Sequence, residues 1–226
     1  SLSNMLGKHQ LALEYADRGL AELAPQSAQG MRIRLLRNQA RAAANLGNLA
    51  QARESLARGL ALSANLVDPK LKAELHLETA RVARADGDRA LVLASAEQVQ
   101  RIAGGLQNTQ LSGQAHELIG LSALDVGDLS EALTEFRASV RSFKELGLMR
   151  DELRVLRFLV AAEVQANTPA EQWTPQLERM LQLETKVSSR DRAEASDDFE
   201  ARLEYAEQRL EVARLEKDAA LARERS

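Results

Sequence analysis

Helix-ending residues recur along this chain at a constant interval of 40 residues. Gly7, Gly47, Gly87 and Gly127 stand in the strings "LGKHQLA", "LGNLAQA", "DGDRALV" and "VGDLSEA". A fifth step reaches Asn167 in "QANTPAE". Glycine, and after it asparagine, most readily adopts the left-handed conformation that terminates a helix. The spacing therefore predicts an internal repeat in which each of these markers ends one helix and turns the chain into the next.

The sequence around the markers predicts a chain that is almost entirely helical. Asn48, Asp88 and Asp128 follow their glycines directly and are good helix N-caps. No alternating run of β-branched residues is long enough to form a sheet. Helices are expected before the markers at roughly 28–46, 70–86, 110–126 and 150–166, and after them at roughly 8–24, 48–65, 88–104, 128–146 and 169–185.

Small residues occupy two further columns of the repeat. One column lies seven residues before the marker and the other twelve residues after it. The first holds Ala40, Ala80, Gly120 and Val160, and the second holds Gly19, Gly59, Val99 and Ser139. Small side chains let helices approach closely, so both columns are expected where the two antiparallel helices of a hairpin cross.

These features together resemble the tetratricopeptide repeat (TPR), although the usual repeat has roughly 34 residues. The resemblance covers about residues 1–185 and implies an all-α, right-handed TPR-like superhelix, an α-α solenoid. We expect this repeat domain at 1–186 and a long, charged C-terminal helix, a linker or signalling helix, at 187–226.

In the TPR family, a groove is lined by residues thirteen, ten, six and three positions before the marker. The resemblance therefore implies a groove that is basic at both ends. Its polar candidates are Arg34, Arg37, Asn38, Arg41, Glu74, Arg81, Arg84, Gln114, Glu117, Arg154 and Arg157. One interpretation is that Arg34, Arg37, Asn38 and Arg41 clamp an acidic peptide, since arginine suits carboxylates. The alternative is that these arginines are solvated or pair with Glu74, Glu78 and Glu117.

The C-terminal segment departs from the repeat and carries apolar residues at alternating spacings of four and three. Phe199, Leu203, Ala206 and Leu210 form this short seam. A parallel coiled coil would make the chain a weak homodimer. The alternative is a solvated helix that packs back on the last repeat.

Composition limits the classes of function. The net charge is −3 and aromatic residues make up 3% of the chain, which argues against a nucleic-acid partner. No apolar run is long enough for a membrane span, and cysteine is absent, so we expect a cytoplasmic protein. His76 and His116 lie 40 residues apart and could face each other, but a structural role is favoured over a metal site. No catalytic motif or cofactor is expected.

We therefore predict a non-catalytic protein- or peptide-binding domain. The array and its charged helix resemble the regulatory region of bacterial signalling proteins such as TPR-containing diguanylate cyclases and sensor kinases, whose output domain would lie outside this chain. The alternatives are a passive scaffold for complex assembly and a receptor domain for peptide pheromones.

Overall fold

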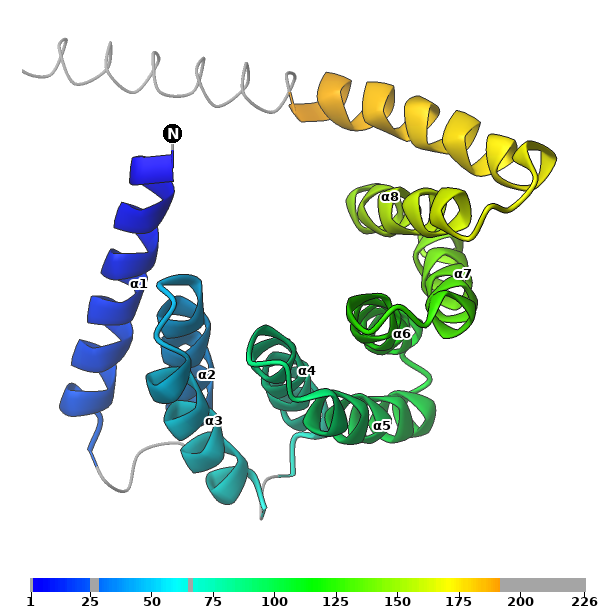
Figure 1. Ribbon diagram of the computed structural model, residues 1–226. Coiled ribbons are helices and arrows are strands. Elements are labelled where there is room, and N and C mark those ends of the chain that lie inside the picture. Colours follow the sequence, from blue (N-terminus) through cyan, green and yellow to red (C-terminus); the bar gives the residue numbers. More distant parts are fainter. Residues whose placement is uncertain (1, 25–28, 65–66, 192–226) are drawn as a thin grey trace, which may run out of the picture. The chain divides into compact units, whose positions relative to one another are not determined.

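The computed structural model describes residues 2–24, 29–64 and 67–191, and these residues form helices and no strand (Figure 1). The helices are α1 (Leu2–Glu22), α2 (Gln29–Asn45), α3 (Leu49–Ser63), α4 (Pro69–Ala85), α5 (Arg89–Leu106), α6 (Thr109–Asp125), α7 (Leu129–Glu145) and α8 (Met149–Gln165). The chain divides into two compact units, Ser1–Leu177 and Glu178–Ser226. Residues 170–177 of the first unit and 178–191 of the second are helical. The predicted seam of Phe199, Leu203, Ala206 and Leu210 lies outside the described residues.

Helices begin every 20 residues from α2 to α8, so each 40-residue repeat consists of two equal helix-turn units. The predicted markers Gly47, Gly87, Gly127 and Asn167 all have positive φ, as expected for helix ends. Two of the turns that lead from one hairpin to the next, α5–α6 and α7–α8, use the same conformation, with φ of 51° at Gln107 and 65° at Gly147. The shorter period escaped the sequence analysis because only one of these two turns contains glycine.

In each of the three turns marked by Gly47, Gly87 and Gly127, the residue after the glycine ends one helix and begins the next. The backbone N–H of Asp88 donates to the carbonyl of Ala83 at 2.9 Å, which closes the C-terminus of α4. The Asp88 carboxylate accepts from the backbone N–H of Leu91 at 3.0 Å, which caps α5. Asn48 and Asp128 do the same, which confirms all three predicted N-caps.

The marker Gly7 was wrongly predicted to end a helix. Gly7 lies inside α1, which runs without interruption from Leu2 to Glu22. The residue after it is Lys8, whereas an asparagine or aspartate follows Gly47, Gly87 and Gly127. Lysine has no side-chain acceptor that could cap a new helix, so the chain continues the same helix through Gly7.

The hairpins stack so that one helix of each contacts its counterpart in the next. Helices α2, α4, α6 and α8, which we call the A layer, contact one another in series. Helices α1, α3, α5 and α7, the B layer, contact A-layer helices but not one another within the described residues. Buried residues of three successive helices form each core cluster, for example Ala73, Val92 and Leu111. This arrangement confirms the predicted all-α solenoid, in which hairpins bury their apolar faces against their neighbours.

The small-residue columns have two different roles. Gly120 lies within its hairpin, as predicted, because a Cβ there would come within 2.7 Å of the Phe136 ring. The column twelve residues after the marker instead faces the following repeat: a Cβ at Gly59 would lie 3.1 Å from Leu75, across the connection between hairpins. Small residues thus allow close packing within hairpins and between them.

The helices within the described ranges lack the combination of length and apolar character that crossing a membrane requires.

Candidate functional site

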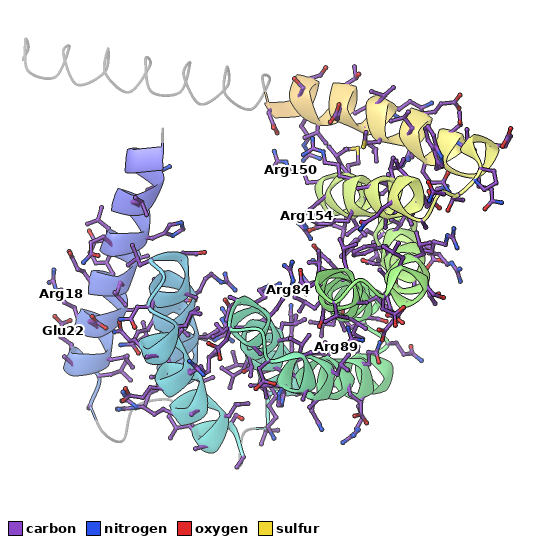
Figure 2. All side chains as sticks on the ribbon, in the orientation of Figure 1. Arg18, Glu22, Arg84, Arg89, Arg150 and Arg154 are labelled. Carbon is purple, nitrogen blue, oxygen red and sulfur yellow. The ribbon has the colours of Figure 1, made fainter. Side chains whose placement is uncertain are left out.

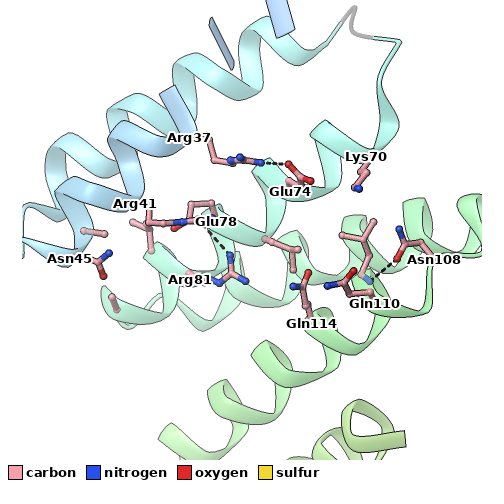
Figure 3. A pocket seen from close by; sticks show the side chains of 15 residues that line it. Arg37, Arg41, Asn45, Lys70, Glu74, Glu78, Arg81, Asn108, Gln110 and Gln114 are labelled. Atoms are coloured by element: carbon pink, nitrogen blue, oxygen red, sulfur yellow. Dashed lines mark hydrogen bonds and ion pairs between the residues drawn. The ribbon is translucent and has the colours of Figure 1, made fainter. Parts of the chain in front are cut away.

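The A layer carries a groove of about 740 Å³ where α2, α4 and α6 meet (Figure 3). Helix α4 contributes more lining residues than α2 or α6. The lining residues are Arg37, Arg41, Ala44, Asn45, Lys70, Glu74, Leu77, Glu78, Arg81, Val82, Ala85, Asn108, Gln110, Leu111 and Gln114. Of the predicted groove residues, this space brings together Arg37, Arg41, Glu74, Arg81 and Gln114.

Two arginines of the predicted clamp are paired with carboxylates of the next A-layer helix. Arg37 donates to Glu74, and Arg41 donates from Nε and Nη2 to one oxygen of Glu78 at 3.0 and 2.8 Å. Glu78 is only 3% exposed and also accepts from Arg81 at 3.1 Å. The structure thus shows the pairing alternative for Arg37 and Arg41. The Arg37 side chain is largely buried, at only 16% exposed.

The other predicted groove residues lie outside this space. Arg34 pairs with Asp68 at 3.6 Å, and Asn38 lines a separate pocket between α1 and α2. Arg84, which is labelled in Figure 2, makes a bidentate pair with Asp125 at 2.6 and 2.9 Å. It also lines an adjoining pocket. Glu117, Arg154 and Arg157 do not line the groove either.

Glu117 and Arg154 form another tie between A-layer helices. Arg154 of α8 donates to both oxygens of Glu117 of α6 at 2.7 and 2.8 Å, and it also pairs with Asp151 at 2.8 Å. Hydrogen bonding to Glu117 raises the pKa of the Arg154 guanidinium above its ordinary value, so Arg154 is charged at any accessible pH.

Several polar groups in the groove have no partner within the described part of the chain. These are the side chains of Asn45, Lys70, Gln110 and Gln114, together with Nε and Nη2 of Arg81. Lys70 and Gln110 were missed by the sequence analysis. They lie 40 residues apart and one helical turn before Glu74 and Gln114, so extending the groove columns by four residues would have found them.

The two repeat-related histidines are not shown to face each other. His116 Nδ1 lies 2.7 Å from Glu135 Oε2 and 3.5 Å from Gln100 Nε2, so its contacts are with the B layer. Burial, together with the charge of Lys72, lowers the pKa of His76. No cluster of three or more potential metal ligands occurs among the described residues.

Comparisons with known proteins bear on the fold alone. No protein-family model matches the chain, and no curated protein matches it in sequence. Solved structures do match, including BtubC (BKLC) from P. vanneervenii, with a TM-score of 0.63 and 13% identity over 82% of this chain and 74% of that one. A putative kinesin light chain with nearly identical TPR-like repeats from Podosopora anserina matches with a TM-score of 0.61 and 21% identity, over 81% of this chain and 90% of that one.

A third match has a TM-score of 0.65 and 17% identity. It is a signal transduction ATPase with numerous domains and a tetratricopeptide repeat sensor, from Pyrococcus horikoshii. The match covers 82% of this chain but only 30% of the ATPase. The fold is that of a tetratricopeptide-repeat array. These structural matches confirm the TPR-like fold that the sequence predicted.

Proposed function

We propose that this chain is a non-catalytic protein- or peptide-binding domain whose binding surface is the A-layer groove. The observation that carries the proposal is the set of polar groups in the groove that have no partner within the described residues. Amide side chains such as Asn45, Gln110 and Gln114 offer a donor and an acceptor each, which suits the backbone of an extended peptide.

The charge of the groove favours an acidic ligand. Four cationic side chains line it, Arg37, Arg41, Lys70 and Arg81, against the two carboxylates Glu74 and Glu78. Arg37 and Arg41 already pair with Glu74 and Glu78, and Arg41 uses both Nε and Nη2 to do so. Lys70 has no partner in the described residues, and Arg81 contacts Glu78 through Nη1 alone, so its Nε and Nη2 can still donate to a ligand. We therefore assign recognition of an acidic side chain to Lys70 and Arg81 rather than to the clamp expected from the sequence.

A regulatory role in bacterial signal transduction, within the cytoplasm, remains part of the proposal. Its support is the fold shared with the tetratricopeptide repeat sensor of the signal transduction ATPase and the charged segment that follows the repeats. The coding sequence downstream of residue 226 distinguishes this role from a passive scaffold or a pheromone receptor. A catalytic output domain there supports regulation, and a stop codon contradicts it.

Short fluorescein-labelled peptides test the groove by fluorescence anisotropy. An Asp/Glu-rich peptide should bind more tightly than a Ser/Gln peptide or a Lys-rich peptide, and its affinity should fall as salt is added. Charge reversal by Lys70→Glu or Arg81→Glu should weaken binding of the acidic peptide by about tenfold.

The matched control is Arg58→Glu, since Arg58 is an exposed arginine of the B-layer helix α3. This variant changes the net charge equally but lies away from the groove lining. Equal weakening by Arg58→Glu and Arg81→Glu would show a general charge effect and would contradict the groove assignment.

A further inference from the structure

The two cations assigned to ligand recognition, Lys70 and Arg81, lie eleven residues apart on helix α4. Eleven residues make about three helical turns, so both side chains lie on the same face of the helix. At a rise of about 1.5 Å per residue, their Cα atoms are separated by about 16 Å along the helix axis. Long side chains on a helix lean toward its N-terminus, so Lys70 points away from Arg81 and does not close this gap. Two separate carboxylates therefore fit the pair of cations better than one.

The stretch of α4 between the two cations carries no charge that a ligand can use. Glu74 and Leu77 follow Lys70 by about one and two turns on the same face. Glu74 and the buried Glu78 are each paired with an arginine of α2, and Leu77 is apolar. A third acidic side chain of the ligand would meet carboxylates or Leu77 here, so the part of the ligand opposite this stretch is uncharged.

Helix α6 borders the same space with two side-chain amides (Figure 3). Gln110 and Gln114 are one helical turn apart and are the repeat equivalents of Lys70 and Glu74. Each amide has donors and an acceptor that find no partner in the described part of the chain. A helical ligand has already used its backbone N–H and C=O groups internally, whereas an extended ligand can offer them to these amides. The amides therefore favour an extended ligand.

We infer that the groove selects an extended segment with two acidic side chains four to six residues apart and an uncharged spacer between them. An extended chain rises by roughly 3.3 Å per residue, so about five residues match the separation of about 16 Å. A helical ligand would need eleven residues to cover the same distance. The inference rests on the proposed function, because it specifies the ligand of the same groove.

Three fluorescein-labelled peptides test the spacing by fluorescence anisotropy with the intact 226-residue chain. Each peptide places two glutamates in a Ser/Gln sequence, and the glutamates are one, five or eleven residues apart. The peptides share one length, composition and net charge, so only the spacing differs. We expect the five-residue peptide to bind about tenfold more tightly than the other two, because a linker that does not match the distance between two sites loses the second contact.

Charge-removing variants assign each glutamate to one cation. Lys70→Gln and Arg81→Gln should each weaken binding of the five-residue peptide by about tenfold. When one of its glutamates is replaced by glutamine, one of the two variants should have no further effect, while the other keeps its effect. Arg58→Gln is the matched control, since Arg58 is exposed on α3 and does not line the groove. It should leave the affinity unchanged.

The possible failures separate the inference from the proposed function. If all three peptides bind equally and both groove variants still weaken them, the groove recognises acidic ligands but the spacing is wrong. Tightest binding of the eleven-residue peptide would show a helical ligand and would also overturn the inference. The same holds if replacing one glutamate cancels the effect of both variants, because a single carboxylate then meets both cations. Absence of saturable binding by every acidic peptide would contradict the proposed function itself.

Discussion

Glu117 and Arg154 occupy the same pair of repeat positions as Arg37 and Glu74, with the charges exchanged. In each pair the first residue lies ten positions before its marker and the second lies thirteen before the next marker. The first pair joins α6 to α8 and the second joins α2 to α4. At the junction of α4 and α6 these positions hold Leu77 and Gln114, and both line the groove. Of these three junctions in the described chain, the one between α4 and α6, which forms one side of the groove, is where no ion pair fills these positions.

Removing one partner of the α6–α8 pair should destabilise the array. We expect Arg154→Ala to lower the free energy of unfolding by about 1–3 kcal/mol, because it leaves the buried Glu117 carboxylate without its charged donor. Denaturant unfolding measures this. Arg101→Ala is the control, since Arg101 and Glu97 form an exposed pair within α5 whose loss should cost at most about 0.5 kcal/mol. The exchanged double variant Glu117→Arg with Arg154→Glu should recover much of the loss.

The close packing of Gly120 predicts a steric effect. Gly120→Ala places a methyl group 2.7 and 2.8 Å from two carbons of the Phe136 ring, so we expect a loss of about 1–3 kcal/mol in unfolding free energy. Gly104→Ala is the matched control in helix α5, where a new Cβ meets no atom within 4 Å. That change should stabilise the chain by up to about 1 kcal/mol through helix propensity. Equal effects of the two substitutions would contradict the predicted contact.

The 20-residue period predicts opposite effects at two equivalent turns. Gln107 adopts φ of 51°, a conformation that glycine tolerates better, so Gln107→Gly should raise the melting temperature. Gly147→Gln places the same strain at φ of 65°. It should lower the melting temperature and reduce the free energy of unfolding by about 1 kcal/mol. Thermal unfolding followed by circular dichroism compares the two directly, and changes of the same sign would refute the assignment of a common turn.

The lowered pKa of His76 predicts that stability depends on pH. Burial keeps the folded-state pKa below the ordinary value of 6.5, so the folded chain binds a proton less readily than the unfolded chain. The stabilising contribution is complete above pH 6.5 and is lost as the pH falls toward the folded-state pKa. The slope of unfolding free energy against pH between 7.5 and 6 should decrease in His76→Leu, which carries the residue found at the equivalent positions 36 and 156. An unchanged slope would argue against this role of His76.

The helices and their turns could be predicted from the sequence because both depend on local chemistry. Glycine markers and the Asn or Asp caps after them determine where a helix ends, whatever lies around it in space. Gly7 shows the limit of this reasoning: a marker without a following cap did not break α1. The turn at Gln107 shows the complementary limit, since an ordinary residue can adopt the left-handed conformation when the flanking Asn108 caps the next helix.

The candidate site was harder to predict because ion pairing depends on neighbouring repeats. The columns pointed to Arg37 and Arg41, which line the groove, but could not show that both already pair with Glu74 and Glu78. Pairing across repeats is set by the offset between stacked helices, which joins residues 37 positions apart rather than 40. Lys70, by contrast, could have been predicted by extending the same columns by one helical turn.

The most direct test of the central claim is to map the bound acidic peptide by amide and side-chain NMR on the isotopically labelled chain. Our account predicts that the largest chemical-shift changes on titration cluster at Asn45, Lys70, Arg81, Gln110 and Gln114, which line the A-layer groove. Changes that cluster on the B-layer helices α3, α5 and α7, or the absence of saturable changes, would contradict the account.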